Sequence, residues 1–270
     1  MRTVKTIIES RPTLEGAGVS LKRVFGFHQV PNYDPFLLLD HFGSGDPSDY
    51  IKGFPWHPHR GIETVTYMIR GEVEHGDNIG NRGVINSGDV QWMTAGSGII
   101  HQEMPRAFDG EMMGFQLWVN LPKNRKMTEP RYRGLIEEDF IPVEVSGGKV
   151  IVISGEYGSR IGPVEDLFVD TEYFDVHIEG EFKHSTKKRT CLIYVYEGSF
   201  YVGDEEILPG HCALLTEEGD VRIEGKGKFI FVAGDPLGEP IAWGGPIVMN
   251  TQEELDLAFG ELREGTFIKR

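Results

Sequence analysis

The chain of 270 residues has few of the features that mark secreted, membrane or nucleic-acid-binding proteins. Its two cysteines, Cys191 and Cys212, are too few for a disulfide framework, which favours a reducing, cytoplasmic compartment. It has no cluster of Lys and Arg, and its net charge of −15 would repel nucleic acid and anionic membranes. No apolar run approaches the roughly 18 residues that cross a bilayer, and the N-terminus lacks the pattern of a signal peptide. We therefore expect a cytoplasmic protein with no membrane segment and no direct nucleic-acid partner.

Glycine and proline are plentiful, with 35 and 15 residues spread along the chain. They separate many short strand-like segments, of which Met113–Val119 shows the period-2 alternation of a half-buried strand. This pattern predicts an all-β protein built as a barrel or jelly roll. One short C-terminal helix is expected at about 251–263, where Thr251 and Glu254 form a capping box and Gly265 follows the last turn.

A polar stretch from 120 to 139, interrupted by two prolines, is the best candidate for a linker. It divides the chain into a predicted N-terminal domain, 1–134, and a predicted C-terminal domain, 135–270, which would end in the helix. The halves resemble each other, because Gly88–Thr94 in the first is similar to Gly210–Thr216 in the second. We therefore expect two tandem β-domains.

Two pairs of metal-capable side chains stand out: His57 with His59, and His101 with Glu103. Residues i and i+2 of a strand point to the same face, so each pair presents two donor groups side by side. The glycine-punctuated turn at 95–98 can double the chain back, which would bring both pairs into one barrel. Neutral imidazole is the commonest metal ligand, so the four side chains predict a metal site. The alternative is that each histidine only packs or hydrogen-bonds at a barrel mouth.

Longer runs around these residues resemble a known family. Gly53–Val65 is similar to the first cupin motif in the form found in the pirin family, and Gly88–Pro105 is similar to the pirin version of the second motif. The likeness extends to Pro35–Asp40, Gly238–Ile241 and Gly245–Thr251, and so covers nearly the whole chain. It implies two tandem cupin (jelly-roll β-barrel) domains, with one mononuclear metal in the N-terminal barrel.

Carried over residue by residue, the resemblance implies that His57, His59, His101 and Glu103 are the metal ligands. Iron is the metal expected, and nickel, manganese, copper, zinc and cobalt remain open because nitrogen and oxygen donors suit all of them. In the wider cupin superfamily the carboxylate ligand lies at the position of Glu63. The pirin pattern favours Glu103 and leaves Glu63 the role of orienting an imidazole.

Two further pocket candidates are Arg60 and Gln116. Arg60 would either supply charge at the pocket mouth or belong to a solvated rim. Gln116, on a strand expected to face the pocket, would either contact the substrate or be an ordinary polar residue of the barrel. The C-terminal half serves as an internal control. Of the five metal-capable positions, only His57 has a metal-capable counterpart there, His184. The second barrel is therefore expected to hold no metal, with His184 as a packing or surface residue.

The resemblance implies a quercetin 2,3-dioxygenase, a metal-dependent oxidoreductase that takes a small aromatic substrate and dioxygen. A site of three His and one Glu leaves open positions where the 3-hydroxyl of a flavonol such as quercetin would bind, and the metal would lower its pKa. Glu103 is expected to be the catalytic base that takes this proton. Cleavage would yield a depside and carbon monoxide.

Two other functions remain open. The alternative from a different class is a non-enzymatic, metal- or redox-responsive regulator that binds a protein partner, as a transcriptional or metabolic cofactor. A weaker one is a cupin isomerase acting on a sugar phosphate, although no anion-binding cluster beyond Arg60 is evident. An enzyme needs a pocket of a few hundred cubic ångströms over the metal. A monomer is expected, because two barrels in one chain mimic a dimer.

Overall fold

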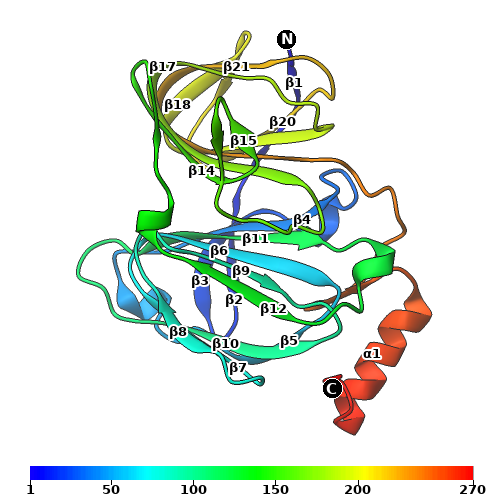
Figure 1. Cartoon of the computed structure of the whole chain (residues 1–270). Helices are drawn as coiled ribbons and strands as arrows, with labels where there is room; N and C mark the ends of the chain where they lie inside the picture. The colour runs from blue at the N-terminus through cyan, green and yellow to red at the C-terminus, as the bar shows by residue number, and fades with distance from the viewer. Residues whose placement is uncertain (270) are drawn as a thin grey trace. The chain divides into compact units, whose positions relative to one another are not determined.

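The computed structural model describes residues 1–269, which form two compact β-units (Figure 1). Unit 1 comprises residues 1–11, 32–35 and 138–236, and unit 2 comprises residues 12–31, 36–137 and, of the described residues, 237–269. The predicted all-β fold with one C-terminal helix is confirmed.

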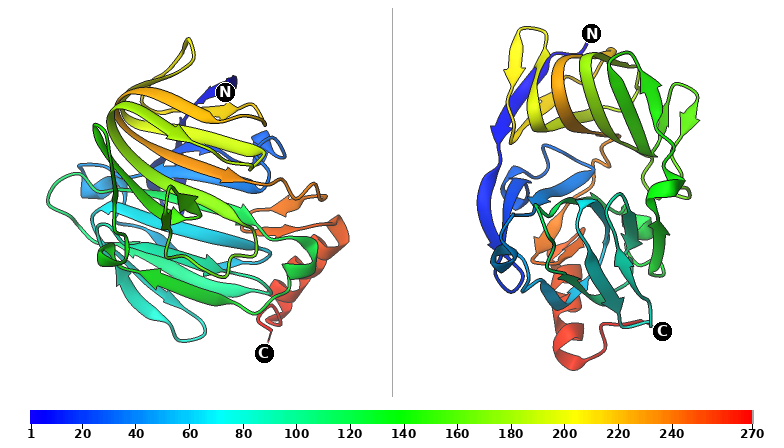
Figure 2. Two further views of the ribbon diagram at one scale, coloured as in Figure 1. Left: turned by 45° about the horizontal axis from the view of Figure 1, so that its top comes forward. Right: turned by 90° about the vertical axis from the view of Figure 1, so that its left-hand side faces the viewer.

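Unit 1 is one curved sheet of eight strands, in the order β1-β20-β18-β21-β17-β14-β13, with β19 paired to β18. Its strands, with the separate hairpin β15-β16, are β1 (Val4–Glu9), β13 (Val143–Val145), β14 (Gly148–Ser154), β15 (Glu156–Tyr157), β16 (Arg160–Ile161), β17 (Thr171–His184), β18 (Thr190–Val202), β19 (Glu205–Ile207), β20 (His211–Leu215) and β21 (Val221–Gly234). The long strands β17, β21 and β18 lie side by side (Figure 2) and enclose an apolar core that includes Phe174, Phe182 and Phe231.

Unit 2 has two sheets, one ordered β12-β9-β6-β11-β4-β3-β2 and the other β5-β10-β7-β8. Its elements, with the hairpin β22-β23, are β2 (Arg11–Glu15), β3 (Val19–Phe25), β4 (Phe36–Phe42), β5 (Phe54–His59), β6 (Ile62–Arg70), β7 (Val73–Asp77), β8 (Arg82–Ile85), β9 (Val90–Thr94), β10 (Ile99–Pro105), β11 (Met113–Asn120), β12 (Arg131–Leu135), β22 (Ala242–Gly244), β23 (Ile247–Met249) and α1 (Gln252–Glu264). Single 3-10 turns lie at Phe27–Gln29, Pro47–Asp49, Lys123–Arg125 and Glu137–Asp139.

Helix α1 begins where the capping box predicts, directly after Thr251. The Thr251 hydroxyl accepts a hydrogen bond from the Glu254 backbone N–H, and the Glu254 carboxylate accepts from the Thr251 backbone N–H. Gly265 ends the helix with a φ of 70°, a left-handed conformation that favours glycine. Helix α1 is neither long nor apolar enough to cross a membrane.

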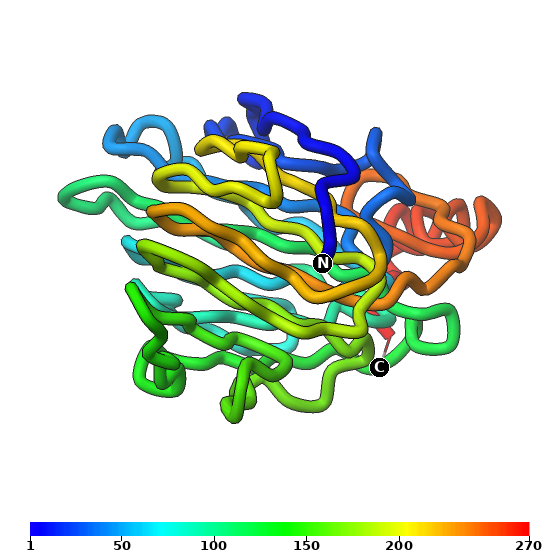
Figure 3. Tube along the Cα trace, turned by 90° about the horizontal axis from the view of Figure 1, so that it is seen from above, coloured from blue at the N-terminus to red at the C-terminus, as the bar shows by residue number. Residues whose placement is uncertain are grey.

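The division into domains 1–134 and 135–270 is wrong at both ends of the chain. The main crossing, between 137 and 138, lies close to the expected boundary. Residues 1–11, however, belong with the C-terminal barrel, and residues 237–269 belong with the N-terminal one. The reason is pairing: β1 pairs with β20 and forms the edge of the unit 1 sheet (Figure 3), and α1 packs on the hairpin β22-β23 of unit 2.

Candidate metal centre

Three histidines converge inside unit 2 from two neighbouring strands. His57 and His59 come from β5, and His101 comes from β10, where it lies directly opposite His57 in the antiparallel register. Alternate residues of β10 are buried, which turns His101 and Glu103 to the interior. One nitrogen from each of the three imidazoles lies within 4.8 Å of the others.

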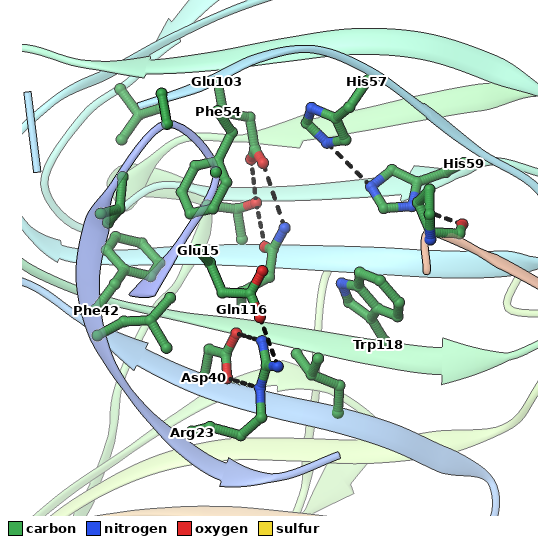
Figure 4. A pocket seen from close by; sticks show the side chains of 18 of the residues that line it. Glu15, Arg23, Asp40, Phe42, Phe54, His57, His59, Glu103, Gln116 and Trp118 are labelled. Atoms are coloured by element: carbon green, nitrogen blue, oxygen red, sulfur yellow. Dashed lines mark hydrogen bonds and ion pairs between the residues drawn. The ribbon is translucent and has the colours of Figure 1, made fainter. Parts of the chain in front are cut away.

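Backbone carbonyls set the tautomers of the two β5 histidines. His57 Nδ1 lies 2.8 Å from the carbonyl oxygen of Pro55, and His59 Nδ1 lies 3.1 Å from that of Pro246. Because a carbonyl only accepts hydrogen bonds, we assign the proton of each neutral ring to Nδ1. The two Nε2 atoms, 3.1 Å apart, then face each other as bare lone pairs (Figure 4). This arrangement is unfavourable unless a cation lies against both atoms.

Burial keeps the rings of His59 and His101 neutral. Burial lowers the pKa of His59 to about 3, with the neighbouring His57 adding to the effect. Burial also lowers the pKa of His101 well below its usual value, and neither of its ring nitrogens has a hydrogen-bond partner among the described residues. Neutral rings with unpartnered buried nitrogens are what a metal ion needs, so these three side chains fit one.

Glu103 lines the same cavity but is not part of the three-histidine group. Its carboxylate lies 2.9 Å from the Thr66 hydroxyl and 3.4 Å from Gln116 Nε2, and the Thr66 hydroxyl also lies 2.6 Å from Gln116 Oε1. Because Thr66 has one hydroxyl proton for two acceptors, this ring of three side chains is fully satisfied when Glu103 carries a proton. Burial correspondingly raises the pKa of Glu103.

Sequence reasoning missed Thr66. A signal was present, since Thr66 lies opposite Gln116 in the register of β6 and β11, and paired residues share a face. Gln116 itself lines the cavity, as its place on a pocket-facing strand indicates.

The expectation that Glu63 orients an imidazole is wrong. Its fully buried carboxylate accepts hydrogen bonds from Trp92 Nε1 at 3.0 Å and Thr94 Oγ1 at 2.5 Å, and it pairs with Arg133 at 2.9 Å. Glu63 does not meet the histidines because the chain changes sheets between β5 and β6. Gly61 makes this turn with a φ of 79°, and a Cβ there would lie 1.9 Å from the Val248 carbonyl oxygen.

Arg60 is also not at the pocket mouth. Its guanidinium, 2% exposed, donates to the carbonyl oxygens of Ser97 and Phe267, each at 2.7 Å, and pairs with Glu261 of α1 at 2.8 Å. It also lies 4.1 Å from the centre of the Phe267 ring. Arg60 therefore fastens the C-terminal segment to the barrel.

Replacing Arg60 with alanine is expected to loosen α1. The variant loses two hydrogen bonds and one side of an ion pair, although Glu261 keeps its contact with Lys269. We expect a loss of about 2–4 kcal/mol in unfolding free energy. Hydrogen–deuterium exchange of the amides of α1 should rise accordingly. The control is Arg70→Ala, which breaks an exposed ion pair and should cost less than about 0.5 kcal/mol. Unchanged exchange of α1 in Arg60→Ala would contradict the assignment.

A cavity of about 750 Å³ opens beside the histidines. Its walls are mainly apolar, and aromatic rings lead inward: Trp243 contacts Trp118 with ring centres 5.8 Å apart, and Trp118 lies edge-on to His59 at 5.0 Å. Trp243 and Pro246 come from the C-terminal segment, and no sequence signal tied them to the site. Such a cavity can hold a drug-sized aromatic molecule against the histidines.

The counterpart of His57 in unit 1 is surrounded by rings. His184 is buried, lies 2.8 Å from the Glu172 carboxylate, and packs against the rings of Tyr157, Phe174 and Phe231. Its contacts are those of a packing residue.

Comparison with known proteins places the whole chain in one group. The family models "Pirin" and "Pirin C-terminal cupin domain" match residues 18–119 and 173–268. A protein of Pseudomonas aeruginosa named "Putative quercetin 2,3-dioxygenase" is 44% identical over 98% of this chain and 97% of its own length. Human pirin is 40% identical over 97% of this chain and 92% of its own length.

Solved structures agree with this relationship. A quercetin 2,3-dioxygenase from Acinetobacter baumannii superposes with a TM-score of 0.92 at 33% identity, covering 99% of this chain and 98% of the other. A bacterial pirin from Escherichia coli in complex with nickel(II) shares the fold, with a TM-score of 0.65 at 19% identity over 86% of this chain and 98% of the other. The two β-units are therefore cupin domains, and the chain belongs to the pirin family.

Proposed function

We propose that this protein is a metal-dependent dioxygenase that cleaves flavonols such as quercetin. The observation that carries the proposal is the pair of facing Nε2 lone pairs on His57 and His59, beside a 750 Å³ aromatic-walled cavity. The relatives named for quercetin dioxygenase activity support the same class of reaction. A mononuclear metal, iron first among the candidates, would be held by His57, His59 and His101 with Glu103 as fourth ligand, and would lower the pKa of the substrate's 3-hydroxyl as a Lewis acid.

The protein's own groups then bind the substrate and handle its proton. The rings of Trp118 and Trp243 bind the flat flavonol and exclude water from it. Glu103 accepts the 3-hydroxyl proton in its ionised form, as the catalytic base. Thr66 and Gln116 hold the carboxylate of Glu103 in place. Overall, one molecule of dioxygen and one of flavonol give one depside and one carbon monoxide.

The test is oxygen-dependent consumption of quercetin by protein whose metal content has been measured. We expect the flavonol absorbance to fall aerobically, to persist anaerobically, and to persist after chelation. Activity should return when one equivalent of metal is restored, and comparing iron with the other candidate metals would identify the most active one. Metal binding without consumption of any flavonol would contradict the proposal and favour the regulator that acts through a protein partner.

A further inference from the structure

A charged cluster lies in the cavity on β2, β3 and β4, and β4 pairs with β11, the strand that carries Gln116 and Trp118. Arg23 of β3 donates from Nε and Nη2 to the two carboxylate oxygens of Asp40 of β4, at 2.9 and 2.8 Å. It also donates from Nη1 to Glu15 of β2 at 2.7 Å. All three side chains line the cavity, and we call them the acidic wall. Figure 4 shows Arg23 and Asp40 on the far side of Gln116 and Trp118 from His57 and His59.

The acidic wall has one positive and two negative groups, so its formal charge is 1 − 2 = −1. Three of the five N–H bonds of Arg23 are used within the cluster. The acidic wall can therefore mainly accept hydrogen bonds from a ligand. The accepting atoms are Glu15 Oε2 and the carboxylate oxygens of Asp40, through the lone pairs that Arg23 does not use. Glu15 is the most accessible member, with 39% of its side chain exposed.

Packing alone does not explain the cluster. Asp40 is 7% exposed, and burial raises its pKa to about 6 even though Arg23 opposes the shift. Apolar residues of similar volume are often as stabilising as a buried ion pair. The neighbouring lining residues Leu21, Leu38 and Phe42 are in fact apolar. A paired but net-negative group facing a ligand-sized apolar cavity suits the binding of hydroxyl groups, which donate hydrogen bonds to carboxylates.

We propose that the acidic wall selects the substrate: it binds ring hydroxyls of a neutral, polyhydroxylated aromatic molecule away from the metal centre, and it excludes aromatic carboxylates. This inference rests on the proposed function, because it assumes that an aromatic substrate occupies the cavity. It specifies which substituents the substrate carries on the rings that lie away from the metal. The metal centre does not contact these substituents and so does not select them.

Anaerobic calorimetric titration of the metal-loaded protein tests the hydroxyl preference without turnover. The ligands are 3-hydroxyflavone, which has no other hydroxyl, galangin, which adds two on one ring, and quercetin, which adds two more on the other ring. Because hydrogen bonds to charged groups are strong, we expect quercetin to bind about tenfold or more tighter than 3-hydroxyflavone. Galangin reveals which ring meets the acidic wall.

Glu15→Leu removes the most accessible acceptor and should reduce the quercetin preference to less than about threefold. Asp40→Asn keeps the shape of the cluster and should also reduce it, which guards against a folding defect in either variant. The matched control is Glu111→Leu, which removes an exposed carboxylate outside the cavity, paired with Arg70, and should leave the preference unchanged.

A second ligand pair tests the exclusion of anions. The pair carries either a carboxylate or a hydroxyl at one position of 3-hydroxyflavone, on the ring that the galangin comparison places at the acidic wall. We expect the carboxylate ligand to bind the wild type at least about tenfold more weakly than the hydroxyl ligand, and Glu15→Leu to reduce this difference in affinity. The inference is overturned if the wild type binds the two ligands equally, or if both acidic-wall variants keep the quercetin preference of the wild type. Neither outcome contradicts the proposed flavonol cleavage. Failure of every flavonol to bind overturns the proposed function and this inference together.

Discussion

His101→Ala is expected to lose metal and activity together. His101 lies on β10, the strand between β5 and β7, and both nitrogens of its ring are buried and have no hydrogen-bond partner among the described residues. Replacing a residue that only hydrogen-bonds to a metal-ligating side chain lowers the metal affinity by about 10–100-fold. Replacing a metal-ligating side chain itself should lower the metal affinity by more than about 100-fold. Turnover should then fall below about 1% of wild type. Metal analysis after dialysis and anaerobic titration with Fe(II) measure the two losses.

The control for this variant is His211→Ala, which removes a half-buried histidine of unit 1 and should retain full metal content. Removing the His101 imidazole also relieves the crowding of the three clustered rings, so His101→Ala should remain folded. The ligand assignment is wrong if His101→Ala keeps its metal at wild-type affinity. The ligand assignment is also wrong if Glu63→Ala remains folded but no longer binds metal.

Within single strands, the sequence was a good guide to the site. The i, i+2 rule placed His57 beside His59 and turned His101 and Glu103 inward, because period-2 geometry holds along an uninterrupted strand. The rule does not extend to the point where the chain leaves one sheet for another. Glu63 counts as the same parity as His59, yet the turn at Arg60 and Gly61 starts a strand in a different sheet. Parity cannot be carried across such a turn.

Features made by distant segments were beyond sequence reasoning. The carbonyl that sets the tautomer of His59 belongs to Pro246, 187 residues away in the chain. Arg60 was expected at the pocket mouth because it follows the histidines in the sequence. The sequence did not show that its partners are Glu261 and Phe267, about 200 residues away in the chain. The assignment of each terminal segment to the other barrel could not be predicted for the same reason. Its evidence lies in pairing partners, such as β1 with β20, and not in local composition.

Glu103→Gln tests the proton-transfer step separately from metal binding. The amide preserves the shape of the side chain and can still hydrogen-bond with Thr66 and Gln116, but it cannot accept the 3-hydroxyl proton. We expect kcat to fall by about 10²–10⁴-fold, the usual contribution of a general base. If the carboxylate is also a metal ligand, metal affinity falls with it, so metal content must be measured on the same samples. Near-wild-type kcat at full metal occupancy would show that Glu103 is not the base.

The pH profile adds a second, independent readout. Activity needs the ionised form of Glu103, and burial raises its pKa, so kcat/KM should decline as the pH falls through that raised value. In Glu103→Gln the residual activity should lack this acidic decline. Thr66→Val removes one hydrogen bond to the carboxylate and should lower kcat by only about tenfold, while keeping the metal. A Thr66 variant as inactive as Glu103→Gln, with its metal retained, would instead assign the proton transfer to the hydroxyl of Thr66.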